Sequence, residues 1–557
     1  MRHSRGNVLF AALLLHAAAA FPQAAGEPEK KVDAVFANYD RPGSPGCALG
    51  VVRDGKLIYA RGYGYANLEY NIPLSPKSIL DIGSTSKQFT ASSIVLLAQQ
   101  GKLSLEDDIR KFIPELPDYG KKITIRQLLN HTSGLRDYLT LFSLSGIDFD
   151  GVTTGDDALR VIVRQKALNF DPGSEYLYSN SGFFLLGEIV KRAGGKSLRE
   201  FAQENIFGPL GMKSTHFHDN HTELVAQRAT GYGPRRDGGF QIDMSGFEQV
   251  GDGAVYTSVE EMLLWDQNYY SGKVGGPGLW QELLVRGVLN NGEKLDYALG
   301  IGHENYKGLD AISHGGSWAG YRAQLIRFPS EKFSVICLCN LAGTDPSSLA
   351  KQVADVYLAD RLKTPEKKPE AAASTAAALS EAELKKYAGA YRSPTSGALR
   401  RLSIRDGKLR IDAFGPSSTE LISAGSNRFR PSGASTTLEF DGASPRPGFT
   451  LLRDNARPEK FEPVEEFSPT ATQLGEFTGQ FASDEIDPGY TVSQEKDALQ
   501  LRIGGSRAPR LMRPVFRDAF ISQGMVVEFQ RDAQKRITGF TVQAGRVRNI
   551  LFTRTGR

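Results

Sequence analysis

The sequence predicts a domain of mixed helices and strands followed by two small antiparallel β-barrels. Helical and strand patterns alternate from about Val32 to Leu362, whereas the following stretch TPEKKPEAAASTAAALS is rich in Pro, Lys and Ala and has no apolar face. Beyond it helical patterns nearly disappear, and LKKYAGAY at Leu384 recurs about 90 residues later as LGEFTGQF at Leu474. At 557 residues, of which 40% are hydrophobic, the chain is too long for one ordinary core.

The repeated segments predict the barrels and set the expected boundaries. KLRI recurs as LQLRI around Leu499, and TLEF recurs as VVEF around Val527. Each repeat holds about eight short alternating runs, and Asp406-Gly407 in IRDGKLRI is a strong hairpin signal. So many strands in so small a unit close most simply into an antiparallel, lipocalin-like barrel without exposed edges. We expect a leader, the mixed domain, a linker and the two barrels at 1–25, 28–362, 363–380, 381–465 and 470–557.

The first residues have the pattern of a secretory signal peptide. Arg2 and Arg5 precede an apolar run from Val8 to Ala20, and small residues continue to Ala25. This pattern predicts a periplasmic or secreted bacterial protein. An apolar run of about 13 residues is shorter than the ~20 that span a bilayer, so we expect no stable membrane insertion after cleavage.

The charge distribution argues against nucleic acid as a partner. The chain has 67 Lys and Arg against 63 Asp and Glu, a formal charge of +4. No basic run interleaves with aromatic residues, as a nucleic-acid surface would require. The oligomeric state cannot be derived from these features.

The cysteines and histidines do not suggest a metal site. Cys337 and Cys339 alternate in FSVICLCN and share one face of a strand, and Cys47 lies in the strand-like run GCALGVV. Because three cysteines cannot all pair within one chain, we expect buried free thiols. The eight His residues are scattered along the sequence, so we expect no Cys/His ligand cluster and no bound metal.

The stretch DIGSTSKQFTASSIVLLAQQG contains a Ser and a Lys one helical turn apart. Ser84 opens the predicted helix and Lys87 follows it, which fits either a helix cap with a solvated cation or a nucleophile with its activator. The spacing alone does not decide, because the same pattern recurs twice, at Ser348/Lys351 and at Ser493/Lys496.

Two other stretches carry candidate site residues. FDPGSEYLYSNSGFFLLGEIVKRAGG places Tyr178-Ser179-Asn180 in a turn at the start of a helix that runs to about Arg192. AISHGGSWAGYRAQLIRFP predicts a strand pair in which His314-Gly315-Gly316 lets another backbone approach closely. Taken singly, each stretch also fits a structural aromatic residue, a helix cap or a glycine bend.

Together, in this order and at these intervals, the motifs resemble those of the serine β-lactamase and penicillin-binding-protein superfamily. Ser84-Thr85-Ser86-Lys87 is similar to its Ser-x-x-Lys, Tyr178-Ser179-Asn180 to its Tyr-x-Asn, and His314-Gly315-Gly316 to its third Lys/His-x-Gly element. LLNHTSGL and GDGAVYTSVEEMLLWD support the resemblance, which covers about 330 residues. It implies an α/β (α+β) β-lactamase/transpeptidase-like catalytic domain, in which helices flank an antiparallel sheet.

The resemblance implies a role for each of these residues. Ser84 would be the nucleophile, and Tyr178 the general base assisted by Lys87, with the first proton acceptor left open between the two. A cation ~4 Å from the phenolate would lower the tyrosine pKa from ~10 to near 7. The backbone N–H groups of Ser84 and Ser317, the residue after Gly316, would form an oxyanion hole.

The remaining implied roles concern the substrate. Asn180 would hold the substrate amide or the Lys, and no metal or organic cofactor is needed. Class C β-lactamases have Lys where this chain has His314, which is mostly neutral at pH 7, so a dedicated β-lactamase is not favoured. D-aminopeptidases resemble this chain both in His-Gly-Gly and in two C-terminal barrels.

We therefore expect an exported serine hydrolase, D-aminopeptidase-like or D,D-peptidase-like, that acts through an acyl-enzyme on an amide or peptide bond. Its substrate would be a small molecule or a short peptide. One alternative is a carboxylesterase of the same superfamily. The other is a catalytically silent penicillin-binding or sensor protein, against which the complete motif set argues.

The second barrel carries an acidic loop, ASDEIDPGY, with Asp484, Glu485 and Asp487. In D-aminopeptidases a loop of the final barrel reaches the catalytic cleft and helps select a free substrate amine. The sequence fits either such an amine-binding loop or an ordinary solvated acidic turn.

Overall fold

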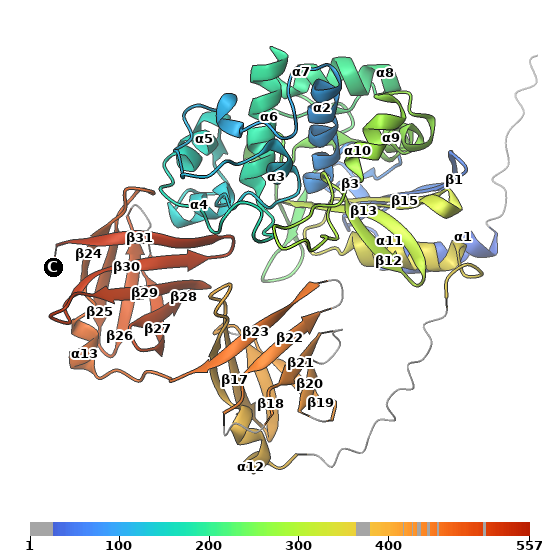
Figure 1. Ribbon diagram of the computed structural model, residues 1–557. Helices are drawn as coiled ribbons and strands as arrows, with labels where there is room; N and C mark the ends of the chain where they lie inside the picture. Colours follow the sequence, from blue (N-terminus) through green and yellow to red (C-terminus); the bar gives the residue numbers. More distant parts are fainter. Residues whose placement is uncertain are drawn as a thin grey trace, which may run out of the picture.

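The computed structural model describes residues 26–363, 379–415, 417–425, 427–431, 436–442, 446–453, 456–504 and 508–556. The expected leader and most of the expected linker lie outside these residues. An N-terminal domain of helices around an antiparallel sheet occupies the top of Figure 1, with the first barrel (orange) below it and the second barrel (red) beside α4.

The sheet of the N-terminal domain has six antiparallel strands in the order β12-β13-β14-β15-β1-β2. Their bounds are Gly302–Tyr306, Leu309–Trp318, Tyr321–Phe328, Phe333–Cys339, Cys47–Arg53 and Lys56–Tyr63. The central strands β14, β15 and β1 are buried on both faces, which explains their nearly continuous apolar sequences. The predicted strand pair around His314 is confirmed as the β13–β14 hairpin.

Helices cover both faces of this sheet. On one face α1 (Glu27–Phe36) and α11 (Pro346–Tyr357) pack on each other and on β14 and β15. On the other face α2 (Lys87–Gln99) and α9 (Val259–Ser271) enter the larger core, and η1 (Gly83–Ser86) packs against β13. The remaining helices are η2 (Ile109–Lys111), α3 (Ile125–Leu129), α4 (Tyr138–Leu144), α5 (Gly155–Val163), α6 (Asn180–Gly194), α7 (Leu198–Ala202), η3 (Gln203–Phe207), α8 (Gly208–Leu210), α10 (Gly276–Leu283) and η4 (Pro329–Glu331).

Short strands connect the helices to the sheet. A three-stranded sheet of order β5-β11-β7 joins Leu80–Asp81, Val255–Thr257 and His216–Phe217. It brings the segments around Asp81, Asp252 and His216 together next to η1. The other short strands are β3 (Tyr65–Asn67), β4 (Ile72–Pro73), β6 (Val152–Thr153), β8 (Tyr232–Pro234), β9 (Phe240–Ile242) and β10 (Gly246–Phe247).

Both C-terminal units are closed barrels of eight antiparallel strands, as the sequence predicts. The first consists of β16 to β23: Gly389–Arg392, Leu399–Arg405, Lys408–Asp412, Thr419–Ser423, Arg428–Pro431, Thr437–Phe440, Phe449–Arg453 and Ala456–Val464, after α12 (Glu381–Leu384) and η5 (Lys385–Tyr387). The second consists of β24 to β31: Gly479–Ala482, Tyr490–Glu495, Ala498–Ile503, Arg510–Phe516, Ala519–Ser522, Met525–Arg531, Ile537–Ala544 and Val547–Gly556, after α13 (Ala471–Gly475).

The recurring sequence segments occupy equivalent strands of the two barrels. KLRI lies in β18 and LQLRI in β26, each the third strand of its barrel, whereas TLEF and VVEF lie in the sixth strands, β21 and β29. Asp406-Gly407 forms the two-residue turn between β17 and β18, and both residues have positive φ (53° and 71°). This backbone is the one that a tight hairpin turn requires.

Helix α4 of the N-terminal domain closes one end of the second barrel. Leu141 and Leu144 are buried within that barrel's core, and the Tyr490 hydroxyl donates a hydrogen bond to the Leu144 carbonyl at 2.6 Å. The second barrel is therefore fixed to the N-terminal domain through a shared apolar core rather than through surface contacts alone.

The expectation of free thiols is wrong for two of the three cysteines. Cys47 on β1 faces Cys339 on β15, and the two form a disulfide with their Cα atoms 4.0 Å apart. They are 292 residues apart in sequence, so only the pairing of β1 with β15 reveals that they are neighbours. Cys337 remains a buried free thiol.

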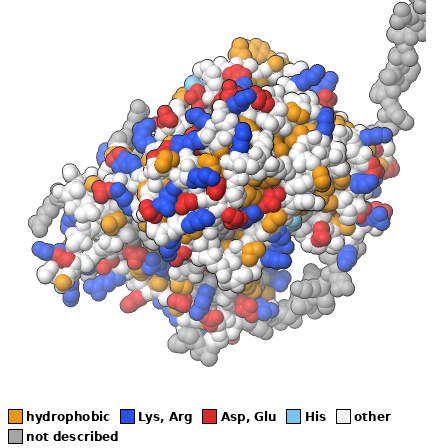
Figure 2. Space-filling view, turned by 45° about the horizontal axis from the view of Figure 1, so that its top comes forward, with side chains coloured by type: hydrophobic (Ala, Val, Ile, Leu, Met, Phe, Trp, Pro, Cys, Tyr) orange, Lys and Arg blue, Asp and Glu red, His pale blue; other side chains and the backbone are white. Residues whose placement is uncertain are grey.

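Surface charge and helix length bear on the expected partners and on the expected absence of membrane insertion. On the face shown in Figure 2, Lys and Arg alternate with Asp and Glu and form no continuous basic area. The absence of a nucleic-acid partner nevertheless stays a prediction. Among the described residues, no helix combines the length and the apolar character needed to cross a bilayer.

Candidate active site

A cleft of about 650 Å³ lies where η1, the N-terminus of α6, strand β13 and the second barrel meet. Its lining contains every residue predicted for the site except Lys87, which is buried directly beneath: Ser84, Tyr178, Asn180, His314, Gly316 and Ser317. The fold therefore brings together motifs that are up to 230 residues apart in sequence, from Ser84 to His314. A larger hollow of about 1250 Å³ on the second barrel is lined by none of these residues.

The backbone around Ser84 forms a tight turn before α2. Gly83 has a φ of +49°, and its N–H donates to the buried Asp81 carboxylate at 2.7 Å. Ser84 lies in η1 and is partly accessible from the cleft, whereas Thr85, Ser86 and Lys87 are buried. Its side chain caps neither η1 nor α2, so the reading of Ser84 as a helix cap does not hold.

Lys87 is fully buried and its ammonium nitrogen points at Ser84. Nζ lies 3.1 Å from Ser84 Oγ and 3.1 Å from Asn180 Oδ1, and it also donates to the backbone carbonyl of Asp252. Burial lowers the pKa of Lys87 to about 7, although the nearby Asp252 carboxylate opposes the shift. At neutral pH a large fraction of Lys87 is therefore the free amine, which can accept a proton.

Tyr178 behaves differently from the prediction. Lys87 Nζ lies 4.9 Å from the centre of its ring, but burial raises the Tyr178 pKa far above 10, and the adjacent Ser84 hydroxyl opposes this only in part. The expected lowering to near 7 is wrong, because desolvation of the phenolate outweighs the field of a lysine that is itself partly neutral. Tyr178 is a protonated phenol at neutral pH.

Two glycines let the backbones of β13 and η1 approach each other closely. A Cβ atom at Gly316 would lie 1.8 Å from the Ile82 carbonyl oxygen and 3.2 Å from the Ser84 nitrogen. A Cβ atom at Gly83 would lie 2.7 Å from the Ser317 nitrogen. A side chain at either glycine would push β13 away from η1, and both Ser84 and Ser317 line the cleft. The oxyanion hole formed by their N–H groups stays a prediction.

His314 is a neutral, fixed side chain. Its Nδ1 donates to the Gly315 carbonyl at 2.7 Å, so its Nε2 accepts from the Tyr297 hydroxyl at 2.9 Å. Burial, with a smaller contribution from the Lys87 charge, lowers the His314 pKa to about 4. The residue that replaces the Lys of class C β-lactamases therefore supplies no positive charge.

Four residues that the motifs did not single out lie around Lys87 and Tyr178. The His131 ring packs on the Tyr178 ring at a tilt of 35°, with ring centres 4.1 Å apart, and His131 accepts from the Ser179 N–H at 3.2 Å. Tyr297 packs edge-on to Tyr178, and the Asp252 carboxylate accepts from the Tyr138 hydroxyl at 3.1 Å. His131 and Asp252 belong to LLNHTSGL and GDGAVYTSVEEMLLWD, the two segments that supported the family resemblance. The sequence therefore identified their segments but assigned neither residue a role.

The other Ser-x-x-Lys patterns lie outside the cleft. Lys351 forms an ion pair with Glu304 at 2.6 Å, and Ser348 is exposed on α11. Ser493 and Lys496 are exposed on the second barrel. Only Ser84 of the three serines meets the other motifs.

The acidic loop of the second barrel docks this barrel and does not enter the cleft. Glu485 is buried and forms an ion pair with Arg136, a side chain that is itself fully buried, whereas the exposed Asp487 pairs with Arg164. None of the three acids lines the cleft. The hypothesis that they bind a substrate amine is therefore wrong, because arginines of the N-terminal domain neutralise Glu485 and Asp487 at the interface.

A different segment of this barrel does reach the cleft. Arg546, in the turn between β30 and β31, lines the cleft and places its guanidinium 4.7 Å from the centre of the Tyr178 ring. The motifs gave no indication of this residue.

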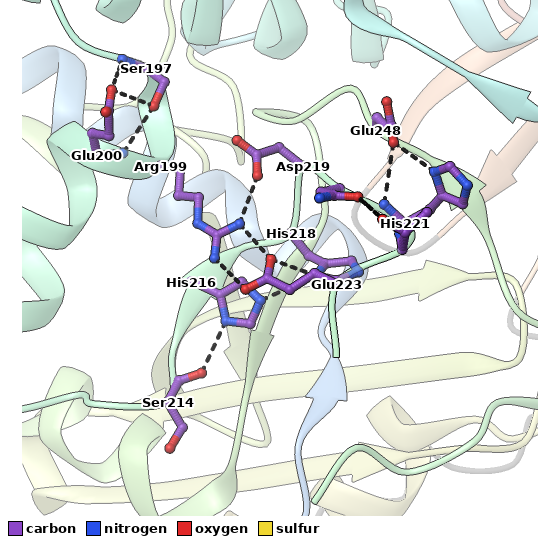
Figure 3. A network of polar contacts seen from close by, with 12 residues as sticks. Ser197, Arg199, Glu200, Ser214, His216, His218, Asp219, His221, Glu223 and Glu248 are labelled. Atoms are coloured by element: carbon purple, nitrogen blue, oxygen red, sulfur yellow. Dashed lines mark hydrogen bonds and ion pairs between the residues drawn. The ribbon is translucent and has the colours of Figure 1, made fainter. Parts of the chain in front are cut away.

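Two clusters of metal-binding residue types occur among the described residues. One consists of the three cysteines, two of which form the disulfide. In the other, His216 Nε2 and His218 Nδ1 lie 3.2 Å apart near Glu223 (Figure 3). The sequence, in which the histidines are scattered, did not predict this cluster. Arg199 binds both oxygens of Glu223, at 2.6 and 2.7 Å, so a metal ion at this cluster would compete with the guanidinium charge for that carboxylate.

Comparisons with known proteins identify the family and the relatives of this chain. The beta-lactamase family model matches residues 32–358, more than half of the chain. A D-aminopeptidase of Cereibacter sphaeroides is 30% identical over 450 residues, which cover 80% of this chain and 81% of the relative. A D-aminopeptidase of Brucella anthropi is 28% identical over 537 residues, which cover 92% and 95%.

A solved structure shows the same fold. The octameric penicillin-binding protein homologue from Pyrococcus abyssi superposes with a TM-score of 0.56 at 23% identity, over 79% of this chain and all of that chain. The chain therefore belongs to the beta-lactamase family of serine hydrolases and is D-aminopeptidase-like over most of its length.

Proposed function

We propose that this protein hydrolyses an amide or peptide bond of a small D-residue substrate through an acyl-enzyme on Ser84. The observation that carries the proposal is the 3.1 Å contact between Ser84 Oγ and a Lys87 amine whose pKa is lowered to about 7. The relatives of similar length are D-aminopeptidases, which favours a D-residue substrate. The leader pattern at 1–25 supports export to the periplasm or the medium.

In this mechanism Lys87 is the general base. Its free amine takes the Ser84 proton, and Oγ attacks the carbonyl carbon of the substrate. The backbone N–H groups of Ser84 and Ser317 stabilise the negative oxygen, a contribution that typically amounts to ~3 kcal/mol per donor. Asn180 holds Lys87 in place through its Oδ1 and leaves its amide N–H groups for the substrate.

Tyr178 is assigned the complementary role of proton donor. Because burial keeps its phenol protonated, it can give its proton to the leaving nitrogen and recover one from the Lys87 ammonium. The C–N bond breaks, the amine leaves, and the acyl group stays on Ser84. A water molecule that loses a proton to Lys87 then hydrolyses the ester and regenerates the serine.

Hydrolysis of D-alaninamide, L-alaninamide and p-nitrophenyl acetate by the full chain and by Ser84→Ala tests the proposal. We expect turnover of the D-amide that exceeds that of the L-amide and is lost in Ser84→Ala. Turnover of the ester alone would instead assign the protein to the carboxylesterases of the family. No turnover of any of the three compounds would contradict a hydrolytic function of this kind.

A further inference from the structure

We propose that Arg546 of the second barrel binds a carboxylate of the substrate, so that the enzyme prefers peptides with a free carboxylate over neutral amides. This inference rests on the proposed function of the Ser84 site and specifies its substrate class. It concerns a residue from outside the catalytic domain, because Arg546 lies in the turn between β30 and β31.

The backbone of this turn is held in place on both sides of Arg546. The Asn169 side chain donates to the Arg546 carbonyl at 2.9 Å and accepts from the Arg548 N–H at 2.8 Å. The buried Arg136 guanidinium donates to the carbonyl of Arg548 at 3.1 Å. Since these anchors use main-chain atoms of the turn, they fix the position of Arg546 and do not depend on its side chain.

The guanidinium of Arg546 retains donors for a ligand. The side chain is 42% exposed, and within the described part of the chain its one charged partner is Asp137, with Nη1 3.7 Å from Oδ2. That carboxylate is already used: Oδ2 accepts from the Asn180 N–H at 2.7 Å, and Oδ1 accepts from Thr140. The planar fork of an arginine is suited to bind both oxygens of an incoming carboxylate.

The other charged residues that line the cleft are Arg322 and the acids Asp81, Asp252 and Asp345. Burial raises the pKa of Asp81 to about 7 and that of Asp252 to about 6, whereas the Asp345 carboxylate caps α11 through the Ser348 N–H at 3.0 Å.

His314 is neutral, and the Arg322 guanidinium donates to the carbonyls of Ala319 and Tyr321 at 2.8 and 2.6 Å. Glu485 and Asp487, two of the loop acids considered as a binding site for a substrate amine, instead form ion pairs with Arg136 and Arg164 of the N-terminal domain. Of the two arginines that line the cleft among the described residues, Arg322 is thus bound to carbonyl groups, and Arg546 has the donors that a substrate can reach. The Arg546 charge also acts within the site, since it lowers the pKa of both Tyr178 and Lys87.

Matched substrate pairs test the inference. D-alanyl-D-alanine and D-alanyl-D-alaninamide differ in a carboxylate on the leaving group, and the N-succinyl and N-acetyl p-nitroanilides of D-alanine differ in one on the acyl side. The quantity measured is the ratio of kcat/KM for the acidic to the neutral member, in the wild type, Arg546→Gln and Arg546→Lys. Arg548→Gln is the control, because it removes the same charge two residues away, where Arg548 pairs with Glu175 outside the cleft.

We expect Arg546→Gln to lower this ratio by about 10- to 100-fold in at least one pair, the usual range for a charge-assisted hydrogen bond in a site. Arg546→Lys should restore part of the ratio, and Arg548→Gln should leave it within about twofold. An unchanged ratio in both pairs, or an equal loss for both members of each pair, would overturn the inference and leave Arg546 a packing partner of Tyr178. Melting curves of the variants check that the barrel stays docked.

Binding separates this inference from the proposed function. If the wild type hydrolyses neither D-alaninamide nor any of the four compounds, the proposed function fails. Calorimetric titration of Ser84→Ala and Ser84→Ala/Arg546→Gln with the same compounds still decides the inference. We expect the Kd of the acidic members to rise about 10- to 100-fold in the double variant, and equal affinities in the two proteins would overturn it.

Discussion

Lys87 Nζ lies 3.1 Å from Ser84 Oγ, with the lysine fully buried and the serine open to the cleft. An isolated lysine would be a permanent cation at neutral pH and could not accept a proton. Burial changes this, because it disfavours the charged form. The pair therefore combines an accessible nucleophile with a base that is shielded from solvent.

Activity should follow the protonation of Lys87. Since its pKa is about 7 and the free amine is the active form, kcat/KM should fall tenfold per pH unit below about 7 and level off above it. The Asp252 carboxylate raises this pKa, so Asp252→Asn should shift the acid limb to lower pH while keeping the main-chain carbonyl that Lys87 binds. pH profiles of kcat/KM measure both effects.

The control for this shift is Asp345→Asn. Asp345 also lines the cleft, but its carboxylate caps α11 through the Ser348 N–H at 3.0 Å and is not among the charges that act on Lys87. The acid limb of the kcat/KM profile of Asp345→Asn should match that of the wild type. A limb that moves to higher pH in Asp252→Asn would rule out Lys87 as the titrating base.

Tyr178→Phe should lower kcat for amides far more than it raises KM. Loss of a general acid typically costs 10²- to 10⁴-fold, and the loss should be small for p-nitrophenyl esters, whose leaving group needs no proton. The acid limb near pH 7 should persist, because Lys87 is intact. Equal losses for amide and ester, together with disappearance of that limb, would return the role of general base to Tyr178.

Gly316→Ala should reduce kcat by about 10²- to 10³-fold, because a Cβ 1.8 Å from the Ile82 carbonyl forces β13 away from η1 and displaces the Ser317 N–H. Gly315→Ala is the matched control. Its Cβ would meet the movable end of the Gln324 side chain at 2.9 Å, so activity should stay near that of the wild type. Equal kcat values in the two variants would show that the amide of Ser317 contributes little.

The motifs predicted the architecture and the residues that line the cleft, because both depend on local patterns. The strand periods and the repeat indicate two barrels, and the glycines after His314 indicate a close backbone approach. The Ser84, Tyr178 and His314 segments each have their own sequence signature. The structure adds that the three signatures meet in one cleft.

The features that the sequence did not predict depend on distant contacts. The direction of the Tyr178 pKa shift follows from burial by His131 and Tyr297, which only the folded chain reveals. The pairing of Cys47 with Cys339 follows from strand register. Arg546 reaches the cleft because α4 docks into the second barrel, and no local pattern of the turn encodes that contact.

Peptide mapping after reaction with a fluorophosphonate probe tests the central claim most directly. At pH 8 the label should appear on the peptide that contains Ser84, should be absent from Ser84→Ala, and should form far more slowly in Lys87→Met, since the base is lost. Ser348 and Ser493 serve as internal controls, because they share the Ser-x-x-Lys spacing but lie outside the cleft. Label on either of them, or undiminished turnover in Ser84→Ala, would contradict the account.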